Sequence, residues 1–158
     1  QALRVPYAGY KGDYQAIQVL APTVNGFPWL AQIAGGSYNN RPLGATYTLV
    51  GDDIPYFLIH LDHHSEAVRL EALDMNRKVV GQVSLDEWVT RNSSATGFFA
   101  FTWSGDVYRK DPNKAQQWSS VPNGDYVVRV SVTKALAEKN NADHVEIWTS
   151  PKITIARP

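Results

Sequence analysis

The chain has 158 residues, enough for one domain with a sizeable buried core. It contains no cysteine, which excludes disulfides, thiolate metal sites and cysteine nucleophiles. Lysine plus arginine and aspartate plus glutamate each number 15, so the charge balance gives no sign of nucleic acid as a partner.

Alternating apolar and polar residues predict short β-strands along much of the chain. In residues 56–63, Phe57, Ile59 and Leu61 fall on one face, while His60 and Asp62 fall on the other. Later segments alternate in the same way, namely 68–72, 98–103, 126–132 and 153–155. Half-buried strands with one wet face, separated by turns, indicate an all-β sandwich or barrel.

Turn residues separate these strands, and helical patterns are nearly absent. Asp74 to Arg77 and Pro122 to Asp125 predict turns, the second with proline to preset φ and glycine to supply positive φ. Residues 85–88 and 135–139 each predict at most one turn of helix, the second ended by Asn140 and the asparagine after it.

Residues 23–46 are rich in glycine, asparagine and proline, and predict a long loop. Such a loop in a compact domain is often functional, or ordered by its own aromatic side chains. The aromatic residues in and next to it are Phe27, Trp29, Tyr38 and Tyr47. They form either a platform on which sugar rings stack or, as we prefer, a set of anchors that pin the loop onto the sandwich.

Three segments carry a resemblance to a known family: VPYAGYKGDY at residues 5–14, the run at 91–105 that ends in FTWSG, and VPNGDY at 121–126. In this order they resemble the fibronectin-like domain of secreted subtilisin-like serine proteases, of the C5a peptidase type. The resemblance covers nearly the whole chain. It implies a single immunoglobulin- or fibronectin III-like β-sandwich over residues 1–158.

The resemblance also implies how the chain enters the sandwich. It implies a strand at residues 5–14, a long loop excursion at residues 15–47, and a return to the sheet at residues 54–57. In the family, further strands precede the first of these segments, so this sandwich either lacks N-terminal strands or is completed differently. A missing strand would leave an edge open to another chain. The expected partner is therefore the catalytic domain of a parent protease or a companion chain completing the sandwich.

The strongest candidate for a metal site is the group His60, Asp62 and His64. On a continuous strand these side chains would point the same way, about 7 Å apart in succession. Imidazole and carboxylate ligands suit zinc or another transition metal. The simpler interpretation is a solvent-facing strand that runs into a turn at residues 63–66, and we expect no metal or other cofactor.

Two shorter motifs are weaker candidates. Asp52 and Asp53 supply adjacent carboxylates without the spaced ligands of a calcium site, and they predict a turn. Asn92 begins an N-glycosylation sequon with Ser93 and Ser94, which would be a surface site in a secreted eukaryotic chain.

Catalytic signatures are missing from the sequence: it has no Gly-x-Ser-x-Gly elbow and neither of the triad segments of the resembled proteases. We therefore expect a non-catalytic, extracellular module of a secreted subtilisin-like protease, which stabilises the catalytic domain or aids recognition of protein substrates. Its contact surface would be residues 15–47, with Phe27, Trp29 and Tyr38 as binding residues. The alternative is a free-standing binding or adhesion module for a glycan or protein.

The first residues of the chain and the length of its apolar runs bear on its cellular location. Residues 1–4 show no signal-peptide pattern and no starting methionine, so we expect a processed piece of a longer secreted protein. No run approaches the ~18 consecutive apolar residues that indicate a membrane span, and we expect no membrane insertion.

Overall fold

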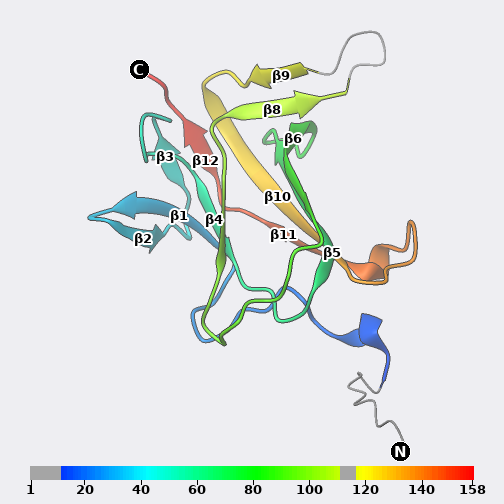
Figure 1. Cartoon of the computed structure of the whole chain (residues 1–158). Helices are drawn as coiled ribbons and strands as arrows, with labels where there is room; N and C mark the ends of the chain where they lie inside the picture. The colour runs from blue at the N-terminus through cyan, green and yellow to red at the C-terminus, as the bar shows by residue number, and fades with distance from the viewer. Residues whose placement is uncertain (1–11, 111–116) are drawn as a thin grey trace, which may run out of the picture.

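The computed structural model describes residues 12–110 and 117–158, and its strands form two sheets packed face to face (Figure 1). The smaller sheet, here called the small sheet, has four strands that are all paired antiparallel. Their order across the sheet is β2 (Ser37–Asn40), β1 (Trp29–Ala34), β4 (Tyr56–Ile59) and β7 (Phe99–Thr102).

The other sheet, here called the large sheet, has eight strands. Its path runs β3 (Ala45–Tyr47), β12 (Ile153–Ile155), β10 (Gly124–Lys134), β5 (Ser65–Leu73), β6 (Val79–Glu87), β8 (Asp106–Arg109) and β9 (Gln117–Ser120). β11 (Val145–Thr149) also pairs with β10, and among the described strands only β3 and β12 pair in parallel. Two 3-10 turns, η1 (Tyr14–Ala16) and η2 (Ala142–His144), complete the regular structure of the described residues. The predicted all-β sandwich is confirmed.

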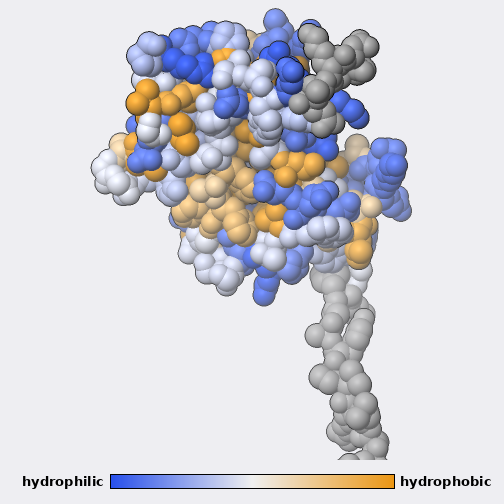
Figure 2. Space-filling model, turned by 45° about the horizontal axis from the view of Figure 1, so that its top comes forward, coloured by the Kyte–Doolittle hydropathy of each residue, from blue (hydrophilic) through white to orange (hydrophobic). Residues whose placement is uncertain are grey.

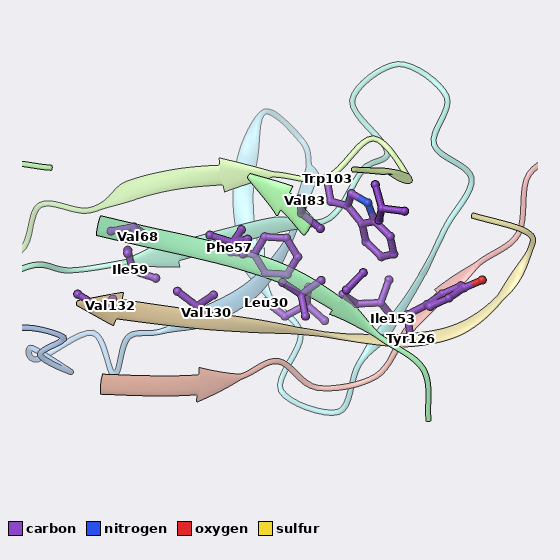
Figure 3. Close-up of a cluster of buried hydrophobic side chains, with 14 of the residues drawn as sticks. Leu30, Phe57, Ile59, Val68, Val83, Trp103, Tyr126, Val130, Val132 and Ile153 are labelled. Atoms are coloured by element: carbon purple, nitrogen blue, oxygen red, sulfur yellow. The ribbon is translucent and has the colours of Figure 1, made fainter. Parts of the chain in front are cut away.

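One hydrophobic core fills the space between the sheets, and side chains from both of them point into it (Figure 3). Trp103 is 1% exposed; its indole N–H donates to the carbonyl of Asp106 at 2.9 Å, and its ring meets Tyr126 edge to face. Phe99 and Phe101 pack against the same core, as the alternation in this segment predicts. Burying a side chain of this size contributes about 1.5–3 kcal/mol, so the core holds the two sheets together.

The predicted loop at residues 23–46 is wrong in one respect, because it contains strands β1, β2 and the start of β3. Gly35 and Gly36 both have positive φ, 62° and 75°, which suits a two-residue hairpin turn, and β1 pairs with β2 across it. Gly35, Gly36 and the asparagines at 39 and 40, which indicated a loop, lie at this turn and on the edge strand β2, whereas Asn25 and Gly26 form a turn before β1. The excursion at 15–47 therefore supplies two strands to the small sheet and one to the large sheet.

Both predicted helical turns are also wrong. Residues 85–87 continue strand β6, because Leu85, Asp86 and Glu87 pair with β5. Residues 135–139 do not form a helix: Leu136 and Asn140 have φ of 60° and 65°, outside the right-handed helical region, and the helical turn forms later, at η2. The predicted turn at residues 74–77 does join β5 to β6, closed by a hydrogen bond from Asp74 N to Lys78 O.

The chain before β1 is anchored to the large sheet. The strand predicted from the family resemblance at residues 5–14 lies outside the described residues up to Lys11, and at residues 14–16 the chain forms η1 instead. Lys134, 6% exposed, donates to the carbonyl of Gln15 at 2.5 Å. The Glu146 carboxylate accepts hydrogen bonds from the backbone N–H groups of Val19 and Leu20. These charge-assisted bonds fix where the segment approaches the sandwich.

Candidate functional site: an aromatic face on the small sheet

Three aromatic residues singled out in the sequence, Phe27, Trp29 and Tyr38, meet on the outer face of the small sheet. Tyr56 and Phe98 join them there, and we call these five residues the aromatic face. Tyr47, the fourth aromatic of the excursion, lies in the main core instead, where its hydroxyl donates to the carbonyl of Ala31.

Strand alternation explains how residues distant in sequence reach this face. In β1, Leu30 points into the main core, so Trp29 and Ala31 point outward. Ala31 pairs with Tyr56 of β4, and Ile33 pairs with Tyr38 of β2, which places these residues on the same side. The small sheet therefore carries a second, smaller apolar cluster behind the main core.

The five rings form a connected set. Phe27 lies 5.0 Å from Trp29 and 5.6 Å from Phe98, measured between ring centroids. Tyr38 meets Phe98 edge to face at 5.6 Å and Tyr56 at 5.3 Å. Distances and tilts of this kind are those that aromatic pairs prefer, and each pair contributes about 0.5–1.5 kcal/mol beyond its buried area.

Burial divides the aromatic face into an inner and an outer part. Phe27 and Tyr56 are buried, as are Ala31 and Leu58 on the same side of the sheet. Tyr38 and Phe98 remain 36% and 40% exposed. The inner rings thus complete a small core, which agrees with the pinning interpretation, while the outer two offer surface to a partner. Figure 2 shows one side of the molecule, on which hydrophobic residues gather in patches beside hydrophilic ones.

Polar groups at the margin of the aromatic face are held in place by the fold. The Trp29 indole N–H donates to the carbonyl of Asn25 at 3.0 Å. Burial raises the pKa of the Tyr56 hydroxyl, and the nearby Asp52 and Tyr38 raise it further, so this hydroxyl stays neutral at physiological pH.

Asp53, one of the two adjacent carboxylates, links β1 of the small sheet to Thr48, the residue after β3 of the large sheet. Its carboxylate accepts hydrogen bonds from the backbone N–H and hydroxyl of Thr48 and from the side chain of Gln32 in β1. Burial alone would raise the pKa of this carboxyl, but these hydrogen bonds together outweigh burial and lower it. The carboxylate thus closes a local turn at Thr48, as the sequence predicts, and also binds the distant Gln32.

The predicted group His60, Asp62 and His64 comes together only in part, because His60 and Asp62 are in contact and His64 is not joined to them. β4 ends at Ile59 and the chain bends at Asp62, so the strand alternation that would align these side chains stops. Asp62 lies 3.8 Å from His60, as predicted, but its other histidine neighbour is His63, at 3.7 Å. The other ring nitrogen of His60, Nδ1, lies 2.7 Å from the carbonyl of Gly97. Across residues 12–110 and 117–158, no three histidine or acidic side chains are placed to hold a metal ion.

Asn92, the first residue of the sequon, is half-buried and joins two loops. Its side-chain oxygen accepts a hydrogen bond from Leu61 N, and its own N–H donates to the carbonyl of Leu61. The segment that carries the sequon is thus bound to the end of β4 while Ser93 and Ser94 are exposed. Its glycosylation stays a prediction.

Sequence reasoning missed Tyr56 and Phe98 as members of the aromatic face. For Tyr56 a signal existed: residues 56–59 are four consecutive apolar residues, a pattern typical of a strand covered on both faces, and all four are buried. For Phe98 there was no comparable signal, because its contacts to Phe27 and Tyr38 depend on which strands are neighbours.

Comparison with known proteins leaves the chain without an assigned family. No family model matches it, and no curated protein is similar to it. The described part of the chain contains no helix with the length and hydrophobicity needed to cross a membrane. The class defined by fold and site is thus an all-β sandwich with an aromatic outer face on its small sheet.

Proposed function

We propose that this chain is a non-catalytic, extracellular accessory module of a secreted subtilisin-like serine protease, and that the aromatic face contacts the catalytic domain of the parent protein. The observation that carries the proposal is the position of the face. Three of its five rings come from residues 15–47, the segment for which the family resemblance implies a contact surface.

The composition of the face supports a protein partner. Tyrosine, tryptophan and phenylalanine are enriched where proteins bind one another, and large rings around a desolvated centre are typical of binding hot spots. Tyr38 and Phe98 supply exposed ring surface, and the buried Ala31 and Leu58 on the same side give it a rigid base. A partner that covers the two outer rings would extend the smaller apolar cluster.

Two of the four histidines make side-chain contacts with backbone groups. His60 Nδ1 faces the carbonyl of Gly97, and His144 Nδ1 accepts a hydrogen bond from Glu138 N. These contacts orient both rings but leave a second nitrogen on each, so the support for a binding role comes from the sequence, which carries neither of the triad segments of the resembled proteases.

The first test is the reading frame that encodes the chain: a subtilisin-type triad upstream is expected. In that full-length protein, the double substitution Tyr38→Ala and Phe98→Ala should lower the thermal unfolding temperature of the catalytic domain or its half-life against self-digestion. The matched control is Trp118→Ala, which removes an exposed ring from β9 of the large sheet. Equal stability of the catalytic domain in both variants would contradict the proposed contact, and a reading frame without a protease would contradict the proposed parent.

A second candidate, a glycan-binding module, is favoured by one observation. Tyr38 and Phe98 present exposed rings, and the exposed Asn40 lies on the same face of the small sheet, opposite Ala31. Ring faces flanked by amide groups suit stacking and hydrogen bonding to a sugar. A glycan array probed with the 158-residue chain and with Tyr38→Ala discriminates the two: signals that vanish in the variant favour the glycan, and a blank array favours a protein.

A further inference from the structure

The open edge of strand β7 is a second feature of the small sheet, separate from the aromatic face. Within residues 12–110 and 117–158, β7 pairs with β4 on one side and with no strand on the other. Since N–H and C=O groups of successive residues in a strand point to opposite edges, one half of the backbone groups of β7 must point away from β4.

The register identifies these outward-pointing groups. Trp103 N donates to Pro55 O, and the pairs Phe57 with Phe101 and Ile59 with Phe99 follow from the same ladder at intervals of two residues. The backbone groups of residues 99 and 101 therefore point toward β4. Those of Ala100 and Thr102 point to the open edge, where they present two donors and two acceptors in extended geometry.

The edge also lacks the features by which proteins protect exposed strands. Natural edges carry charged side chains, prolines or bulges that prevent pairing with another chain. Residues 98–103 read Phe-Phe-Ala-Phe-Thr-Trp, with no charge and no proline, and the ladder with β4 has an unbroken register. The edge strand β3, by contrast, has three residues, and the carbonyl of Thr46 already accepts a bond from Gln32.

The side chains of β7 that point toward the main core are also incompletely covered. Phe99 and Phe101 pack against the main core but are only half-buried. The small sheet has four strands against eight in the large sheet, and another strand beside β7 would extend it. Apolar side chains at alternate positions of that strand would cover the exposed parts of both phenylalanines.

We propose that β7 accepts an extended segment of a partner polypeptide as a fifth strand of the small sheet. The segment pairs with the backbone of Ala100 and Thr102, and it carries apolar residues at every second position, directed toward the main core. This is β-augmentation, in which backbone hydrogen bonds give affinity and alternate side chains give selectivity. The site does not depend on the aromatic face or on the nature of the parent protein.

The test uses the 158-residue chain and a short peptide that alternates valine and threonine, with lysine at each end. Amide hydrogen exchange is followed by NMR. In the free chain, the N–H groups of Ala100 and Thr102 should exchange much faster than those of Phe99 and Phe101. Bound peptide should slow exchange at Ala100 and Thr102 by at least about tenfold, because these amides become hydrogen-bonded. The same peptide with N-methylated amides should have no effect.

Variants then locate the binding. Ala100→Pro removes an outward N–H while leaving the ladder to β4 intact, and should abolish the slowing of exchange at Thr102. Ser120→Pro is the matched control at the edge of β9, and Tyr38→Ala tests independence from the aromatic face; both should bind the peptide as the unaltered chain does.

Three results would overturn the proposal. One is no change in exchange at the highest soluble peptide concentration, and another is slowing confined to residues outside β7. The third is protection of Ala100 and Thr102 in the free chain that rises with protein concentration, which would assign the edge to a second copy of the chain.

Discussion

The two sheets differ in the residues that lie on their outer faces. The outer face of the large sheet includes charged residues, for example Arg129 and Glu71, which form an ion pair at 2.7 Å across β10 and β5, beside the buried pair Val127 and Leu73. The outward positions at the centre of the small sheet are apolar, and Ala31 and Leu58 there are as buried as residues of the main core. A sheet with one wet face needs only one core. The small sheet has its other face covered as well, by rings from its own strands and from the loop residues Phe27 and Phe98.

The largest expected loss of stability comes from substitutions on the two faces of β4. Phe57 points into the main core and Leu58 into the aromatic face, both at most 1% exposed. We expect Phe57→Ala to lower the free energy of unfolding by about 3–5 kcal/mol and Leu58→Ala by about 2–5 kcal/mol, measured by urea denaturation. Phe57→Leu and Leu58→Met, which keep most of the volume, should cost less than about 1.5 kcal/mol each.

A cost below about 1 kcal/mol for Leu58→Ala would break the comparison, because such a small loss is typical of a side chain that water still reaches. The small sheet would then have one core and one wet face like the large sheet.

A medium effect is expected from the rim of the aromatic face. Tyr38→Ala removes two ring contacts, to Tyr56 and Phe98, from a side chain that is 36% exposed. The expected loss is about 1–2 kcal/mol, since each ring pair contributes about 0.5–1.5 kcal/mol. Trp118→Ala removes a single ring contact, to Tyr108, from a side chain that is 61% exposed on the large sheet, and should cost less. Thermal unfolding of both variants checks the order, and a larger loss for Trp118→Ala would reverse it.

The smallest effect is a pH dependence at the junction of the two sheets. The pKa of Asp53 is lowered in the folded chain, so its contribution to stability is present above the unfolded pKa, about 4, and is lost as the pH falls through the folded value. Asp53→Asn should therefore be less stable than the unaltered chain at neutral pH, with the difference shrinking below about pH 4. Urea midpoints between neutral and acidic pH check this; a difference independent of pH would assign the effect to packing.

The sequence by itself determined the strands with clear alternation. In β10, Tyr126, Val128, Val130 and Val132 all face the main core, because a period of two leaves one apolar face that must be buried. The same rule placed Phe99, Phe101 and Trp103 together. Local chemistry was equally informative at the turn between β5 and β6, which a few adjacent residues define.

Tertiary structure alone decided which strands are neighbours, and with them the aromatic face. Phe27 and Phe98 are separated by most of the excursion and the whole of β4 to β6, yet their rings meet because β1, β4 and β7 are adjacent in one sheet. The group at His60 failed for the converse reason: alternation aligns side chains only while the strand continues, and β4 ends at Ile59. Alternation is a local property, whereas strand order depends on burial summed over the whole chain, which no short segment encodes.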